Sequence, residues 1–210
     1  MPARTATTLL LIARDPGTGR LRYPTVLDAG LRATLFADLI LSGRIRSDGL
    51  GPVAADVPPS GDRILDAVHR AVAGRRDVAW ARWYRHVRAD REVLTAELVE
   101  QGRWESTGGR LRPTFRDTAP DVTLDAAQHT LAVTEKRGQP RDSAEAVLAV
   151  VAVLCGAVGG APRPRALRSE LITLLDTIGG TTDPVRRAMQ TSLFGATVGM
   201  RRARQRRFTG

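Results

Sequence analysis

The sequence predicts a mostly α-helical protein in which strands are confined to short hairpins. Apolar residues recur at helical intervals over most of the 210 residues, and only two short segments carry hairpin signals. The segment from Ser143 to Val158 is apolar on almost all sides, which is typical of a central helix in a soluble protein. With 42% hydrophobic residues the chain can form one substantial core. We therefore favour a single domain over residues 1–200, followed by a basic tail at 201–210.

The first half of the chain is predicted to contain one long and one short helix. The buried face of the long helix is defined by four leucines at a spacing of four residues: Leu27, Leu31, Leu35 and Leu39. The expected elements are, in order, an apolar segment at 9–13, a turn at 15–19, a helix from Pro24 to Ser42 that ends at Gly43, a hairpin that turns at Asp48-Gly49, and a helix at 64–72.

The second half is predicted to be helical apart from one hairpin. The expected elements are a helix from Trp80 to Gly102, a hairpin at 103–115, helices at 124–134 and 143–158, and a helix at 166–177. We expect Gly159-Gly160 to end the apolar helix, and the segment RRARQRRFTG to be a frayed basic tail.

The helix from Trp80 to Gly102 is lined with arginines. Arg82, Arg85, Arg88 and Arg91 recur every third residue, so Arg88 and Arg91 present neighbouring guanidinium groups about one turn apart. Two such groups suit a phosphate, because guanidinium binds phosphate oxygens in a planar, bidentate way. An ordinary solvated charged face in an arginine-rich protein remains the alternative.

Two segments of the chain echo each other. Residues 37–45 read ADLILSGRI and residues 96–104 read AELVEQGRW, so each is an amphipathic helix that ends in Gly-Arg and precedes a hairpin. The unit has two interpretations: a winged-helix-like DNA-binding module that occurs twice, or a structural unit that caps a helical core.

Composition and motif searches favour a binding protein over an enzyme. The net charge of +10 and the pI near 11.3 predict a polyanionic partner, either nucleic acid or an anionic membrane surface. Cys155 is the only cysteine, the three histidines are far apart in sequence, and no nucleophile or P-loop pattern occurs. We expect no enzymatic activity, no metal and no cofactor. The longest apolar stretch, 146–158, is too short to span a bilayer, so membrane contact is expected to be peripheral.

Several motifs in order resemble the Golgi phosphoprotein 3 family. They are Gly30-Leu31-Arg32 with the helix that ends in LSGRI, the loop PPSGDRILDAV, and the segment VRADREVLTAELVEQGRW. The resemblance runs from about Thr8 to Leu175. It implies a core helical bundle surrounded by amphipathic helices with short β-hairpins. The high alanine and arginine content is typical of a GC-rich bacterium, so roles tied to a Golgi apparatus are not expected.

The resemblance also implies a function and its residues. It implies binding of phosphatidylinositol 4-phosphate, or another anionic phospholipid headgroup, in a pocket formed by Tyr23, Arg32, Arg88 and Arg91. Self-association is implied through the hairpin at 103–115. The expected location is cytoplasmic, with peripheral attachment to the cytoplasmic face of a membrane. The alternative is a winged-helix-like DNA-binding protein, which we favour less because the helix before the first hairpin carries only Arg32 as a basic residue.

Overall fold

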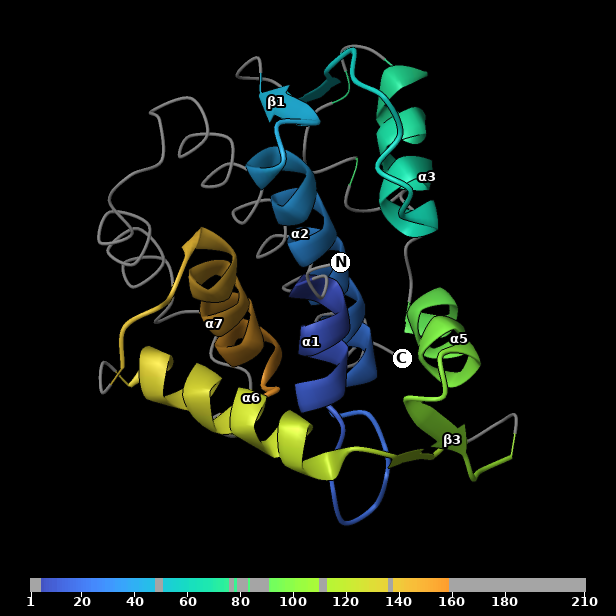
Figure 1. The fold of residues 1–210 in the computed structure, drawn as a ribbon, viewed down its shortest axis with the longest axis vertical. Coiled ribbons are helices and arrows are strands. Elements are labelled where there is room, and N and C mark those ends of the chain that lie inside the picture. Colours follow the sequence, from blue (N-terminus) through green and yellow to red (C-terminus); the bar gives the residue numbers. More distant parts are fainter. Residues whose placement is uncertain are drawn as a thin grey trace, which may run out of the picture.

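A computed structural model describes residues 5–47, 51–75, 78, 83, 91–109, 113–135 and 138–158. The helices among them are α1 (Thr5–Ile12), α2 (Pro24–Leu41), α3 (Arg63–Ala73), α5 (Arg91–Glu100), α6 (Pro120–Thr134) and α7 (Ser143–Cys155). The strands β1 (Ile45–Ser47) and β2 (Pro52–Ala54) form one antiparallel pair, and β3 (Trp104–Ser106) and β4 (Phe115–Asp117) form the other. The fold is mostly α-helical with short hairpins, as predicted (Figure 1).

Helix α2 lies at the centre of the core, packed against α1 and α7. Pro24 starts it with a preset φ, and Gly43, at φ 70°, follows its end. The four leucines predicted for its buried face are all fully buried. Burial extends further than predicted, because none of the α2 side chains that the structure describes is exposed.

Helix α7 is the predicted central apolar helix, and Asp142 caps its N-terminus by accepting a hydrogen bond from the Glu145 amide. Its side chains are buried almost throughout. The expected stop at Gly159-Gly160 was wrong. Gly156 ends the helix instead, because it adopts φ 69° and lets the Ala157 amide bond back to the Ala152 carbonyl.

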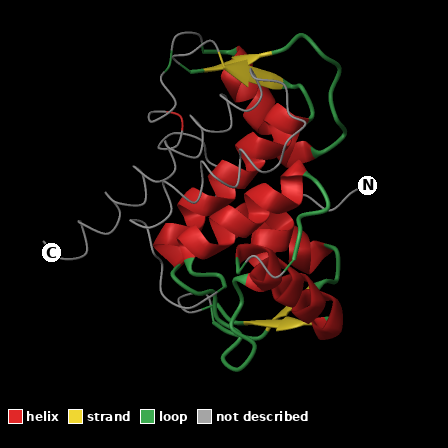
Figure 2. Ribbon diagram, turned by 90° about the vertical axis from the view of Figure 1, so that its left-hand side faces the viewer, coloured by secondary structure: helices red, strands yellow, loops and turns green. Residues whose placement is uncertain are grey.

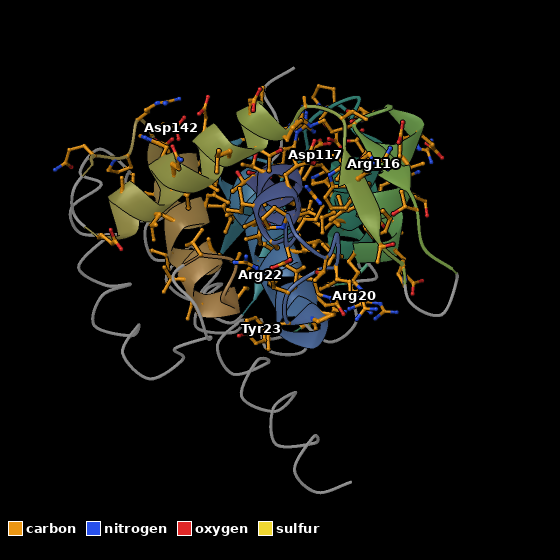
Figure 3. All side chains as sticks on the ribbon, turned by 90° about the horizontal axis from the view of Figure 1, so that it is seen from below. Arg20, Arg22, Tyr23, Arg116, Asp117 and Asp142 are labelled. Atoms are coloured by element: carbon orange, nitrogen blue, oxygen red, sulfur yellow. The ribbon has the colours of Figure 1, made fainter. Side chains whose placement is uncertain are left out.

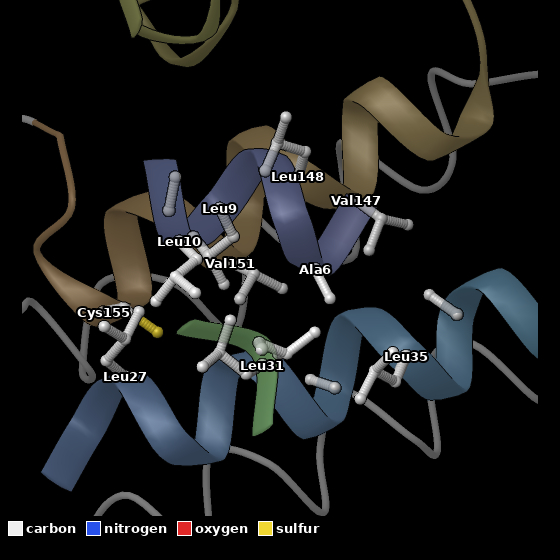
Figure 4. Close-up of a cluster of buried hydrophobic side chains, with 14 of the residues drawn as sticks. Ala6, Leu9, Leu10, Leu27, Leu31, Leu35, Val147, Leu148, Val151 and Cys155 are labelled. Atoms are coloured by element: carbon white, nitrogen blue, oxygen red, sulfur yellow. The ribbon is translucent and has the colours of Figure 1, made fainter. Parts of the chain in front are cut away.

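A glycine lets α2 and α7 approach closely. A Cβ atom on Gly30 would lie 2.2 Å from Cys155 Sγ, so only glycine fits at this point of the interface (Figure 4). Burial raises the pKa of the Cys155 thiol to about 12, so the thiol stays protonated at neutral pH. Gly30 of the Gly-Leu-Arg motif is therefore a packing residue.

Two other helix boundaries differ from prediction. Helix α6 begins at Pro120 and not near Leu124, because proline fits the first helical turn and Asp121 complements the helix dipole. Helix α3 begins at Arg63, where the Asp62 carboxylate accepts hydrogen bonds from the amides of Ile64 and Leu65. The Asp48-Gly49 turn, the expected helix at 166–177 and the tail at 201–210 lie outside the described residues.

The internal echo is a repeated local structure. After α2 and after α5 a glycine adopts a left-handed conformation, at Gly43 and Gly102, and the amide of the following arginine bonds back across the last helical turn. A hairpin follows each time. The two hairpins lie at opposite ends of the helical bundle (Figure 2).

The arginine of each repeat fastens its hairpin to the next helix. Arg44 Nη1 donates to the Pro58 carbonyl at 2.6 Å and lies 4.0 Å from the Asp66 carboxylate of α3. Arg103 Nη2 donates to the Ala119 carbonyl at the start of α6, and its Nε lies 3.6 Å from the buried Asp117 carboxylate. These contacts favour the structural-unit interpretation of the echo over the DNA-binding one.

Candidate functional site

Charged side chains interrupt the buried surface of α2 at three places, Asp28, Arg32 and Asp38, and each is half-buried. Half-buried charges are costly unless they are paired, so their partners indicate what each one does. Asp38 has a structural role, because it accepts hydrogen bonds from the amide and the hydroxyl of Thr5. Asp28 and Arg32 lie nearer the start of the helix.

Asp28 joins α2 to the arginine-lined helix. Arg91 Nη1 of α5 lies 3.7 Å from Asp28 Oδ2, and the side chains keep 32% and 23% of their exposure, respectively. Asp28 and Arg32 are four residues apart on one helix, which places their Cβ atoms about 5–6 Å from each other. The structure therefore pairs Arg91 with a carboxylate that lies one helical turn from Arg32, although α2 and α5 are far apart in sequence.

Arg88 falls outside the described residues, as do Arg82 and Arg85. Trp83, from the same predicted helix, is helical and almost fully buried. The position of Arg88 beside Arg91 therefore remains a prediction from their helical spacing.

Tyr23 lies directly before α2 and has an unusual backbone. Its φ of 45° is the only positive value at a non-glycine position among the described residues, and its side chain is 40% exposed. A left-handed tyrosine is strained by about 1–3 kcal/mol, and such strain clusters at binding sites. Tyr23 is nine residues before Arg32, about 13.5 Å along the helix axis. Tyr23 therefore lies at the start of α2, more than two helical turns from Arg32.

The segment before Tyr23 is held in place by the second hairpin, which the sequence did not reveal. Gly19 accepts a backbone hydrogen bond from Phe115 of β4 at 2.8 Å, and Arg14 Nη1 donates to the Phe115 carbonyl at 3.1 Å. Figure 3 shows Arg20, Arg22 and Tyr23 on this segment, seen from below. Thr18 donates backbone and hydroxyl hydrogen bonds to Asp15, and these lower the pKa of that carboxyl.

A hollow of about 390 Å³, which neither Arg32 nor Arg91 lines, lies between α1, α6 and the start of α7. Within it His129 Nε2 is 2.8 Å from Glu145 Oε1, so this histidine links α6 to α7. His69 lies 3.0 Å from the Ala55 carbonyl through its Nε2 atom.

Among the described residues no three potential metal ligands gather in one place. No helix in that same part of the chain has the length and apolar character needed to cross a membrane.

The family model for Golgi phosphoprotein 3 (GPP34) matches residues 6–194. The chain belongs to this family. The match includes α2 to α7, all of α1 except Thr5, and all four positions of the predicted headgroup site. No curated protein matches the chain. Within this Golgi phosphoprotein 3 family member, the neighbourhood of Arg32 and Arg91 on α2 and α5 is the candidate functional site.

Proposed function

We propose that this Golgi phosphoprotein 3 family member is a peripheral membrane protein that binds an anionic lipid headgroup through Tyr23, Arg32, Arg88 and Arg91. The headgroup is phosphatidylinositol 4-phosphate or one of similar charge. The observation that supports the proposal is the 3.7 Å ion pair from Arg91 to Asp28, a residue one helical turn before Arg32 on α2. Guanidinium groups from two different helices offer a phosphate several donors from different directions.

The charge of the protein supports reversible attachment. An arginine near an anionic surface contributes about 1 kcal/mol, so three site arginines and a basic tail suffice without a lipid anchor. Tyr23 would lie at the headgroup level, where tyrosine keeps its ring in apolar surroundings and its hydroxyl in water. Self-association through the hairpin at 103–115 would multiply a weak single attachment. The proposed location is the cytoplasmic face of a membrane, and the proposed role is binding without catalysis.

The described part of the chain does not favour the DNA-binding alternative. A recognition helix must insert an accessible polar face into the major groove. Helix α2, which precedes the first hairpin, has no exposed side chain among those described, and Arg44 and Arg103 contribute their charges to internal contacts.

The ligand class is tested by co-sedimentation with vesicles that contain phosphatidylinositol 4-phosphate, phosphatidylinositol or phosphatidylserine, beside a gel shift with random duplex DNA. We expect the strongest pelleting with phosphatidylinositol 4-phosphate. Salt weakens both kinds of binding, so salt sensitivity alone does not distinguish them. Tight DNA binding without pelleting would refute the proposal.

The site residues are tested by changing Arg88 and Arg91 together to alanine. Two charge-assisted contacts at about 1.5–3 kcal/mol each predict at least a hundredfold loss of affinity for the phosphorylated headgroup. A double change of Arg116 and Arg141 removes the same charge from side chains that are 72% and 77% exposed, and should have little effect. Truncation after Met200 should weaken binding to all anionic vesicles about equally. If only the truncation matters, the arginines form an ordinary solvated face.

A further inference from the structure

We propose that Asp28 is a built-in counter-ion of the arginine site, which a headgroup phosphate must replace on Arg91. The inference rests on the proposed headgroup site and adds a residue that lowers the affinity of that site for anions. The anion that still binds is the one with the stronger attraction to the arginines, a phosphomonoester headgroup.

The geometry gives Asp28 two effects on the site. Its carboxylate lies 3.7 Å from the Arg91 guanidinium, so it occupies a direction from which that group could bind phosphate. It also stands one helical turn from Arg32, so a phosphate seated on both arginines would have this carboxylate about 6 Å away. Asp28 keeps only 23% of its side-chain exposure, so water screens it less than it screens a surface carboxylate.

These effects lower the affinity of the site for an anion by an amount that depends on the charge of the anion. A phosphodiester carries one negative charge, the same as the carboxylate that it replaces, so the exchange on Arg91 yields little net attraction. A phosphomonoester carries about 1.5 to 2 negative charges and three acceptor oxygens at neutral pH, so it gains from the exchange. Asp28 would therefore leave singly charged lipids with little net attraction, while it reduces the affinity for a phosphomonoester by the larger factor and still leaves it a net attraction.

Changing Asp28 to asparagine tests the inference, because the amide keeps the size of the side chain and removes its charge. In water a unit charge at about 6 Å alters affinity roughly threefold for each charge on the ligand, and this is a lower limit for the partly buried Asp28. We therefore expect D28N to bind phosphatidylinositol vesicles at least about threefold, and phosphatidylinositol 4-phosphate vesicles at least about tenfold, more tightly than wild type does. D28E retains the charge and should behave like wild type.

Glu105→Gln is the matched control. Glu105 also forms an ion pair with an arginine, at 3.6 Å from Arg116, but it is 60% exposed and lies on β3. Its loss changes the net charge by the same amount and should change the affinity for either vesicle less than twofold. Thermal unfolding checks that each variant is folded, and D28S replaces D28N if the asparagine variant is not.

The outcomes separate the inference from the proposed function. If wild type binds and D28N binds no more tightly, the counter-ion inference is wrong and the headgroup site stands. Equal gains on both vesicles would also overturn it, because a charge effect must scale with the charge of the ligand. If neither wild type nor D28N binds either vesicle, the headgroup site fails and the inference fails with it.

Discussion

The close contact between α2 and α7 at Gly30 predicts that Gly30→Ala is destabilising although alanine is the better helix former. The added methyl group would lie 2.2 Å from Cys155 Sγ, 3.0 Å from Val151 Cγ1 and 3.4 Å from Leu9 Cδ2. Real contacts of a Cβ are longer than the first of these, so either α2 and α7 move apart or the buried Cys155 side chain changes its rotamer.

The size of the effect follows from two opposing contributions. Overpacking of a core costs about 1–3 kcal/mol, and the short contact with sulfur puts this site at the upper end. The higher helix propensity of alanine offsets about 1 kcal/mol of this cost. We expect Gly30→Ala to lower the free energy of unfolding by about 2 kcal/mol.

A double-mutant cycle with Cys155→Ala isolates the contact. Without the sulfur atom the nearest neighbour is Val151 Cγ1 at 3.0 Å, which needs to move only slightly. Gly30→Ala should then be nearly neutral, which gives a coupling energy of about 2 kcal/mol by urea denaturation. Gly43→Ala is the control, because its φ is 70° and no atom lies within 4 Å of the added Cβ. It should cost about 1 kcal/mol through backbone strain, whether or not Cys155 is present. Additive effects of Gly30→Ala and Cys155→Ala would refute the packing argument.

Three further predictions concern side chains that hold the fold together. Arg103→Met should lower the free energy of unfolding by about 3–5 kcal/mol because it leaves Asp117 buried without its cation, whereas Arg116→Met on the surface should cost less than about 1 kcal/mol in the same urea titration. The hydrogen bonds from the Ser60 amide and hydroxyl lower the pKa of Asp66 below its usual 3.8, so their stabilisation is complete above that pH and is lost as the pH falls through the native pKa. The urea midpoint of wild type should therefore fall more steeply in acid than that of Asp66→Asn, and parallel curves would contradict this. Cys155 should not react with a thiol reagent at pH 8 until the protein unfolds, because burial raises the pKa of its thiol to about 12.

The elements that the sequence predicted best are those with strong local signals. The run of apolar residues in α7 and the leucine spacing in α2 both indicate burial directly. Gly43 was predicted to end the helix from Pro24, and in the structure it follows the end of α2. The stop of α7 was missed because a glycine in an apolar run, Gly156, is as compatible with the helix interior as with its end. The early start of α6 at Pro120 is signalled by the proline, a signal that the predicted start near Leu124 did not use.

The candidate site was only partly predictable. The arginine positions came from the family resemblance, and the structure pairs Arg91 with Asp28, one helical turn from Arg32. No local pattern could have revealed that carboxylate as their neighbour, because an ion pair between two helices depends on how the helices pack. The left-handed backbone of Tyr23 was equally hidden, since tyrosine rarely adopts it and the bonds of the preceding segment to β4 impose the entry into α2.

The central claim is that Arg32 and Arg91 bind one phosphate, and an NMR titration tests it most directly. The ligand is a water-soluble, short-chain phosphatidylinositol 4-phosphate, and the signals are the Nε–H resonances of Arg32, Arg91 and Arg103. Arg103 serves as the internal reference because its guanidinium group is held by the Ala119 carbonyl and the Thr123 hydroxyl. We predict that the Arg32 and Arg91 resonances shift together with a single Kd while that of Arg103 stays in place. Saturating ligand that leaves Arg32 and Arg91 unshifted, or shifts them with different Kd values, would contradict the claim.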